Sequence, residues 1–532
     1  MKTLAILFAM VMTMGSANAA HYDVAEKDIA TLQADLSSGR VTSEQLVHAY
    51  LERIDKLDRN GPRLQSVIAT NPRAIDHARA LDAERRAKGA RGPLHGIPII
   101  VKDNIETADP IATTAGSLAL ADNITLRDAP AVARLRAAGV IILGKANLSE
   151  WANIRSSRSI SGWSAIGGLT KNPYVLDRSA CGSSSGSGSA IAASLAAAAL
   201  GTETDGSLVC PGSINGIVAL KPTVGLVSRT HVIPISHSQD TPGPMTRTIA
   251  DAALLLAVMS GSDKDDPATA EADLRLADYP AALATASLKG RRLGVIVPDP
   301  GTVPSETDIV FAQAVAAIKA QGAEIVEIHN LAPPPPDIGT TELTVLEYEL
   351  KHDLNTYLAT LAPGQKIKTL ADALAFNDAT PRETALFGQD IFAKAQSLGD
   401  LTDQTYIKAR DDLKTYSRDT LDKLFNENRL DALIRSTDDA SFRIDVVKGD
   451  NDTSNSSFLP ATAGYPHLTV PMGFVRGLPV GLSFIGPAWS EARLLALGHA
   501  FEQTTHARKP PQFLPSLEAE TDIASAFAPQ AR

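Results

Sequence analysis

A lysine and two serine-rich segments of this sequence contain the residue types of a hydrolytic site. The lysine is Lys102, which ends the short apolar run 97–101, and the segments are 181–189 and 201–207. A serine hydroxyl is a weak nucleophile and needs a base within hydrogen-bond reach. A lysine can act as that base only when it is neutral, and burial lowers its pKa from about 10.4. The β-branched run before Lys102 predicts a buried strand that delivers the lysine at its end.

These segments together resemble the amidase signature family. The lysine, the two serines, their order and their spacing agree with that family. Further similar stretches are found at 144–151, 171–174, 219–223 and 243–245. The resemblance covers residues 28–262 strongly and 455–505 more loosely, and the chain between them is not specific.

The resemblance implies a hydrolase with a Ser-Ser-Lys triad that works through an acyl-enzyme. Ser207 is expected to be the nucleophile, and Ser183 to pass its proton to Lys102 and later return one to the leaving amine. The Gly182–Ser183 peptide is expected to be cis, as in the family. The backbone amides expected to form the oxyanion hole are those of Thr204, Asp205, Gly206 and Ser207. One such donor contributes about 3 to 4 kcal/mol of transition-state stabilisation. No metal or organic cofactor is expected.

Departures from the family pattern bear on the substrate. Many members have Gly-Gly before the nucleophile and Ile-Arg after it, whereas this chain has Asp205-Gly206 and Leu208-Val209. In amidotransferase-type members that arginine helps to hold a carboxylate-bearing amino acid, so Val209 weighs against glutamine and other free acids. The stretch 202–207 is most similar to bacterial peptide amidases, which remove the C-terminal amide from peptides. We therefore expect a peptide amide or small-molecule amide as substrate, with fatty acid, aryl or aliphatic amides as the alternative.

Five further polar residues near these motifs have other expected roles. Lys145 also follows a predicted strand, but the family gives its position a structural or substrate-loop role. Asp103 and Asn104 either orient the catalytic lysine or cap the strand end, and the sequence leaves both readings open. Glu203 and Asp205 are expected to brace their loop rather than to transfer protons.

Two rival interpretations explain less of the sequence. Residues 182–186 fit the G-x-S-x-G elbow of α/β-hydrolases, with Ser184 as nucleophile. That fold needs a later acidic residue and then a histidine, and no downstream histidine has a supporting local pattern. It would also leave Lys102 and Ser207 unexplained. The other rival is a non-catalytic exported binding protein on the same scaffold, but all three catalytic positions are filled.

The order of helical and strand patterns predicts an α/β fold, the amidase signature fold, with a mixed β-sheet core covered by helices on both faces. Thr42 is the expected N-cap of the second of two helices between 28 and 57. The other expected elements are a helix at 129–138, a strand at 140–143, a small-residue helix at 190–199, a β-α-β-like unit at 293–328, strands at 459–470 and 481–485, and a helix at 491–503. The helical region at about 335–440 is expected to be a cap that shapes specificity.

The N-terminal residues have the pattern of a secretory signal peptide, assigned to 1–19. Lys2 precedes the apolar run 4–14, and small residues follow at 15–20. The apolar run is about half of the roughly 20 residues that span a bilayer, so no membrane anchor is expected. We expect one amidase domain at 20–510, a tail at 511–532, and export to the periplasm or the medium.

Composition excludes some partners and leaves other questions open. The net charge is -10 and no block of Lys or Arg stands out, which argues against a nucleic-acid partner. The 2 cysteines, Cys181 and Cys210, are too few for a disulfide-built fold, and the sequence does not decide between a disulfide and two buried thiols. No obligate protein partner is evident. The preferred amide and the oligomeric state are not determined.

Overall fold

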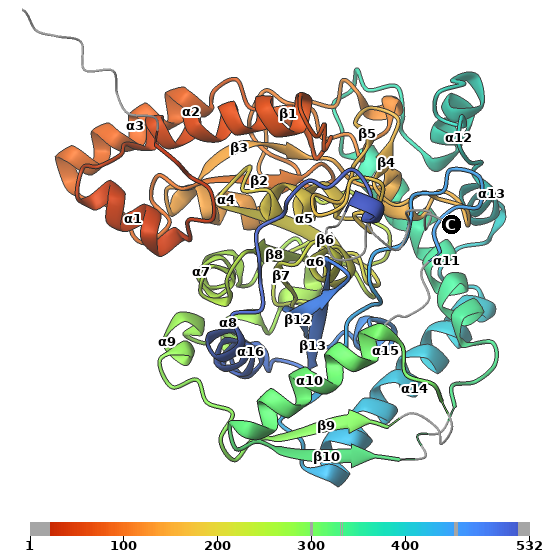
Figure 1. Cartoon of the computed structure of the whole chain (residues 1–532). Helices are drawn as coiled ribbons and strands as arrows, with labels where there is room; N and C mark the ends of the chain where they lie inside the picture. The colour runs from red at the N-terminus through yellow and green to blue at the C-terminus, as the bar shows by residue number, and fades with distance from the viewer. Residues whose placement is uncertain (1–21, 298–301, 330, 332, 452–455, 520–532) are drawn as a thin grey trace, which may run out of the picture.

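A mixed sheet runs through the centre of the molecule. The structure, a computed structural model, describes residues 22–297, 302–329, 331, 333–451 and 456–519, and in these residues the sheet has 11 strands (Figure 1). Their order across the sheet is β1-β3-β2-β6-β8-β7-β12-β13-β11-β9-β10. The strands are β1 (Val67–Thr70), β2 (Pro98–Lys102), β3 (Ile141–Ala146), β6 (Ala198–Glu203), β7 (Val218–Lys221), β8 (Thr241–Thr246), β9 (Arg292–Ile296), β10 (Glu324–Ile328), β11 (Ala432–Ser436), β12 (His467–Val475) and β13 (Leu478–Ile485). β2 runs parallel to β3 and β6, whereas β8 is antiparallel to β6 and β7. The predicted mixed sheet is confirmed.

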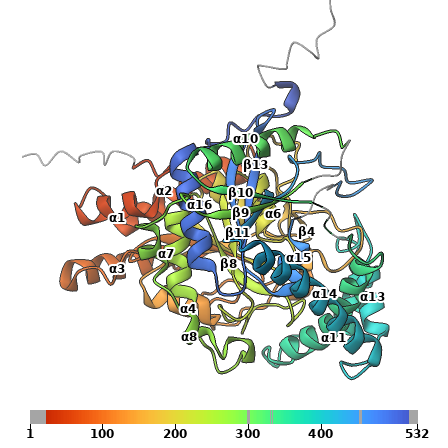
Figure 2. The same cartoon turned by 90° about the horizontal axis from the view of Figure 1, so that it is seen from below.

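Helices cover both faces of this sheet, as predicted. Along β12, Thr469 packs against Gly212 of α6 (Val209–Ile214), whereas Leu468 and Val470 pack against Gly498 of α16 (Glu491–Thr505). Successive side chains of a strand point to opposite faces, so α6 and α16 lie on opposite sides of the sheet (Figure 2). The other helices outside the cap are α1 (Ile29–Ser37), α2 (Ser43–Arg53), α3 (Ala74–Lys88), α4 (Pro130–Ala137), α5 (Ser185–Ala192), α7 (Ile249–Met259), α8 (Ala272–Arg275), α9 (Tyr279–Leu283), α10 (Glu306–Ala320) and α15 (Phe458–Ala463).

Four further helices, here called the cap helices, gather beside the sheet (Figure 1). They are α11 (Ile338–Ala359), α12 (Leu370–Ala379), α13 (Asp390–Ser397) and α14 (Gln404–Asn428). Apolar side chains of α11, α12 and α13 share a buried cluster with Trp151 and Ile233, which lie on loops of the main fold. Helix α14 packs against α11 in a separate apolar cluster. The ring of Phe392 meets the ring of Trp151 edge-on, with centroids 5.6 Å apart. Burial of these apolar side chains therefore attaches α11, α12 and α13 to two loops of the main fold.

Several local predictions are confirmed. Thr42 caps α2, and Gln45 completes a capping box by accepting a hydrogen bond from the Thr42 backbone. The β9-α10-β10 unit lies at one edge of the sheet, where β9 and β10 are parallel.

Among the described residues, no helix has both the length and the apolar character that a membrane span requires. The predicted signal peptide and most of the predicted tail lie outside those residues.

Two predictions of secondary structure are wrong. The small-residue helix predicted at 190–199 ends at Ala192, and Ala198 begins strand β6. Ala199 pairs with Ile100 of β2 on one side and with Met245 of β8 on the other. Hydrogen bonds to two neighbouring strands in a buried position outweigh the helical preference of alanine.

The strand predicted at 459–470 is the second error. Its first residues belong to helix α15, which ends at Gly464 in the left-handed conformation with φ of 75°. Strand β12 begins only at His467. The apolar run 458–463 is too short for its period to separate a strand from a buried helix.

Candidate active site

Lys102 occupies the end of a fully buried strand in the middle of the sheet. Strand β2 lies between β3 and β6, and all of its residues are buried. The Lys102 ammonium donates hydrogen bonds to Ser183 Oγ at 2.7 Å, Thr202 Oγ1 at 2.9 Å and the Thr202 carbonyl at 3.1 Å. Burial lowers the pKa of Lys102 to about 7, although the negative charges of Asp240 and Glu203 act to raise it. The apolar strand thus produces a lysine that is substantially neutral near pH 7.

Ser183 lies on the loop that enters α5. The Gly182–Ser183 peptide is cis, as the family resemblance implied. The Ser149 amide donates to the Ser183 carbonyl at 3.1 Å, which ties this loop to the residues that follow β3. A Cβ on Gly182 would lie 2.2 Å from Ser149 Oγ, so any larger residue at this position would force the Ser149 hydroxyl to move.

Ser207 lies on the turn between β6 and α6, next to Ser183 in space. The Ser184 amide donates to the Ser207 carbonyl at 3.2 Å, so the backbones of the two serine segments are in contact. Ser207 is 8% exposed. Gly206 has a φ of 79°, a conformation that favours glycine directly before the serine. The fold therefore brings together Lys102, Ser183 and Ser207 from three separate segments.

Two carboxylates hold the turn 204–207. Glu203 accepts hydrogen bonds from the amides of Leu208 at 2.8 Å and Val209 at 3.1 Å, directly after the turn. Asp240 accepts one from Thr204 Oγ1 at 2.6 Å. Glu203 thus braces the loop, as expected. Asp240 does the same from outside the motif, and nothing in the local sequence pointed to it.

The other polar residues singled out in the sequence divide between two roles. Asn104 donates to Thr202 Oγ1 at 2.9 Å, the same oxygen that Lys102 contacts, and so helps to orient the partner of the lysine. Asp103 instead contacts Lys145 at 3.8 Å and accepts from Thr114. Lys145 is fully buried and bonds to the Ile105 carbonyl and Thr113 Oγ1, both at 2.6 Å.

Thr202 was not predicted, although it contacts the lysine with both its hydroxyl and its carbonyl. Thr202 lies inside the serine-rich segment 201–207, but its contact with the lysine follows from the pairing of β6 with β2 rather than from any motif. Val101 of β2 is in register with Leu200 of β6, so Lys102 and Thr202 meet where the two strands end. The order of the strands in the sheet is therefore needed to place Thr202 beside Lys102.

Cys181 and Cys210 form a disulfide, which settles the question that the sequence left open. Cys181 lies just before the cis peptide, and Cys210 is in the first turn of α6, just after Ser207. The bond therefore joins the Ser183 loop covalently to the segment that follows Ser207. Both cysteines are buried.

Ser184, the nucleophile of the rival interpretation, is engaged with the backbone of strand β6. It is fully buried, and its hydroxyl donates to the Thr202 carbonyl at 3.1 Å. Its contact is a structural hydrogen bond to strand β6, which gives no support to an elbow nucleophile.

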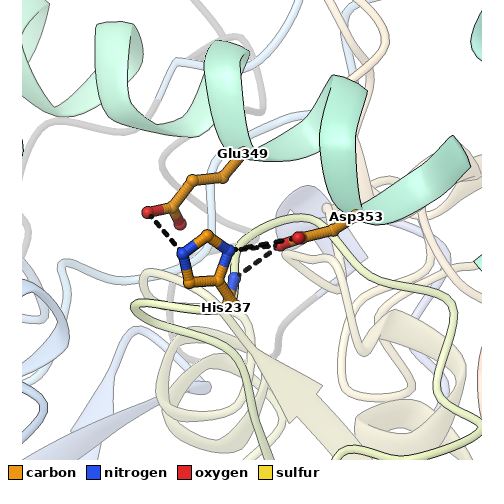
Figure 3. A group of neighbouring side chains, drawn as sticks. All are labelled: His237, Glu349 and Asp353. Carbon is orange, nitrogen blue, oxygen red and sulfur yellow. Dashed lines mark hydrogen bonds and ion pairs between the residues drawn. The ribbon is translucent and has the colours of Figure 1, made fainter. Parts of the chain in front are cut away.

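One group of side chains has the residue types of a metal site, namely His237, Glu349 and Asp353 (Figure 3). Asp353 lies 2.9 Å from His237 Nδ1, whereas Glu349 lies 3.3 Å from His237 Nε2. Because the carboxylates face opposite nitrogens of the ring, the three groups do not converge on one ion. Glu349 also accepts hydrogen bonds from Ser238 Oγ and the Tyr406 hydroxyl, at 2.6 and 2.7 Å. The geometry fits a histidine between two carboxylates, which joins helix α11 to the loop that contains His237.

Comparisons with known proteins agree with one another. The family model described as Amidase matches residues 45–495. A probable amidase of Arabidopsis thaliana is 39% identical, over 95% of this chain and 96% of its own length. The structure of native peptide amidase from Stenotrophomonas maltophilia is 47% identical with a TM-score of 0.86, over 92% of this chain and 99% of that one. The structure of an amidase family protein from Bacillus anthracis is 35% identical with a TM-score of 0.82, over 92% of this chain and 93% of that one.

Proposed function

This chain belongs to the amidase family and is an amidase, and we propose that it removes the C-terminal amide of peptides with Ser207, Ser183 and Lys102 as its catalytic residues. The observation that supports this assignment most is the hydrogen bond of 2.7 Å between the buried Lys102 ammonium and Ser183 Oγ. The lysine is at the end of strand β2, and the serine is on the loop before helix α5. Their hydrogen bond joins two side chains and is not one of the backbone hydrogen bonds that hold the sheet together.

The reaction needs one proton path and one site for negative charge. Ser207 Oγ attacks the amide carbonyl and transfers its proton to Ser183, which passes one to neutral Lys102. The charge that develops on the carbonyl oxygen is stabilised by backbone amides of the turn, Thr204 to Ser207. The relay then returns a proton to the leaving nitrogen, ammonia departs, and an acyl group remains on Ser207. Water, deprotonated by the same relay, attacks this acyl-enzyme and releases the acid.

The likeness to peptide amidase supports the choice of substrate. That relative and this chain correspond over nearly their full lengths. Val209 stands where an arginine would favour a free carboxylate, which supports an amide without an acidic group at that point. A single chain suffices for this activity, so we propose no obligate protein partner.

The test is ammonia release from a short C-terminally amidated peptide, run beside a fatty acid amide. We expect release from the peptide amide by the wild type and none by Ser207→Ala. Release only from the fatty acid amide would overturn the substrate class, and an active Ser207→Ala variant would overturn the assignment of the nucleophile. The thermal stability of Ser207→Ala, measured beside the wild type, is the control for correct folding.

We also propose that the protein is exported, with residues 1–19 as its signal peptide. The lysine, apolar run and small residues of that segment support this. The disulfide between Cys181 and Cys210 supports it independently, because disulfides persist in oxidising compartments.

A further inference from the structure

A carboxylate lies on the turn that carries Ser207. Of the turn residues 204–207, Thr204 and Ser207 are both 8% exposed, whereas Asp205 and Gly206 are more open. Asp205 is therefore the charged side chain of this turn that lies beside the nucleophile with part of its surface open. Its carboxylate accepts a hydrogen bond from Ser457 Oγ at the N-terminus of α15. This bond holds the carboxylate in one place.

A second carboxyl group comes from the cap helices. Glu342, in the second turn of α11, is hydrogen-bonded to Asp205. The Gln239 side-chain amide donates to Glu342 at 2.9 Å and to the Thr204 carbonyl at 3.3 Å. The Asp205 and Glu342 carboxyl groups thus share one proton. They lie where the turn 204–207, the loop that contains Gln239 and helix α11 meet.

The shared proton leaves one negative charge on this pair at neutral pH. Burial and the charge of Asp205 raise the pKa of Glu342 well above its usual range, so Glu342 holds the proton. Burial raises the pKa of Asp205 to about 6, so Asp205 is ionised at pH 7 and above. The other charged groups that face Asp205 are Glu203 and Lys221, which oppose each other in sign.

From this arrangement we propose that the Asp205–Glu342 pair selects substrates by charge, rejecting amides whose residue next to the reacting carbonyl carries a carboxylate. The inference rests on the proposed peptide amidase function and adds the charge class of the substrate. A fixed negative charge in a site from which water is partly excluded repels an acidic side chain and favours a neutral or cationic one. Glu342 is a positioning residue in this scheme, because it acts through Asp205.

The experiment uses three amidated peptides that differ only in the residue before the amide: alanine, glutamate or lysine. At pH 8 we expect wild-type kcat/KM to be at least about tenfold lower for the glutamate peptide than for the alanine peptide, as one unit charge a few ångströms away would produce. In Asp205→Asn this ratio should fall to about threefold or less. In the control Glu491→Gln, which removes a buried carboxyl at the Thr223 amide, the ratio should stay as in the wild type.

Glu342→Gln separates a charge effect from a packing effect. Its amide can donate to Asp205 as the protonated carboxyl did, so the ratio at pH 8 should persist. In the wild type the ratio should decline as the pH falls through about 6, and in Glu342→Gln this decline should stay near the same pH, because one neutral donor replaces another. A ratio that Asp205→Asn leaves at its wild-type value, or equal wild-type rates on all three peptides, would overturn the inference alone. A wild type that hydrolyses none of the three would overturn the proposed function as well.

Discussion

Burial of Lys102 sets the pH range in which the relay can work. Only the neutral amine accepts a proton, and burial lowers the pKa of Lys102 to about 7. We therefore expect kcat/KM to be level above about pH 7 and to fall about tenfold for each pH unit below it. A profile that stays flat down to pH 4 would contradict a lysine base. Lys102→Ala should lose about 10²- to 10⁴-fold in kcat.

The adjacent serines 183 and 184 provide a matched pair of variants. Ser183 Oγ contacts Lys102, whereas Ser184 Oγ bonds only to the backbone of Thr202 among the described residues. Ser183→Ala should lose at least about 10²-fold in kcat, because the proton path is broken. Ser184→Ala should keep its rate within a few-fold and lose about 1 kcal/mol of stability, the usual contribution of one hydrogen bond. Steady-state rates and urea unfolding of both variants test this. Loss of acylation in Ser184→Ala would instead favour Ser184 as the nucleophile.

Helix α11 attaches to the main fold through acidic residues on one face. Glu342, Glu349 and Asp353 all bond to the loop that contains Ser236, His237, Ser238 and Gln239. The same loop leads to Asp240, which holds Thr204. The cap helices therefore touch the catalytic turn through a short chain of hydrogen bonds.

His237 should make this attachment depend on pH. Burial opposes protonation, but the hydrogen bond to Asp353 and the charges of Glu349 and Asp353 outweigh it and raise the pKa of His237. The protonated form is therefore stabilised by folding: its contribution is complete below the pKa of a free histidine, about 6.5, and is lost as the pH rises through the raised value.

The variant His237→Gln should lower the stability by about 0.5 to 1 kcal/mol at pH 6, a value discounted because the side chain is 43% exposed. The loss should shrink at pH 9, where the wild-type histidine is neutral. Denaturant unfolding at the two pH values measures it. A loss of equal size at both would mean that the charge of the imidazole plays no part.

The disulfide should stabilise the pair of catalytic segments. It joins residues with a sequence separation of 29, and closing a loop of that size stabilises a folded protein by about 2–4 kcal/mol. The double variant Cys181→Ser/Cys210→Ser should show this loss in chemical denaturation, together with reduced activity. Reduced wild-type protein should match the variant. An unchanged unfolding midpoint in both would contradict the expectation.

We expect the mature protein outside the cytoplasm, because the proposed signal peptide directs export. Mass spectrometry of the exported protein should then find an N-terminus near Ala20 and no free thiol. A chain lacking residues 1–19 and made in a reducing cytoplasm should show 2 reactive thiols after unfolding, because the sequence contains 2 cysteines. Full-length protein retained in the cytoplasm would contradict export.

Local sequence determined much of this protein. Its motifs pointed to the lysine and the two serines, and its periodic patterns to α2, α4, α10 and α16 and to the parallel unit β9-α10-β10. These features depend on residues close together in the chain. The family resemblance further implied the cis peptide before Ser183, which the structure contains.

Only the tertiary structure decided the rest. Alanine at 198 and 199 favours a helix by itself and becomes a strand because β2 and β8 pair with it on both sides. Thr202 and Glu342 become neighbours of the catalytic residues through strand order and helix docking, which local sequence does not encode. The disulfide was undecided for the same reason. Contacts between residues distant in the chain depend on how whole elements pack, because burial and pairing free energies are gained only when the elements meet.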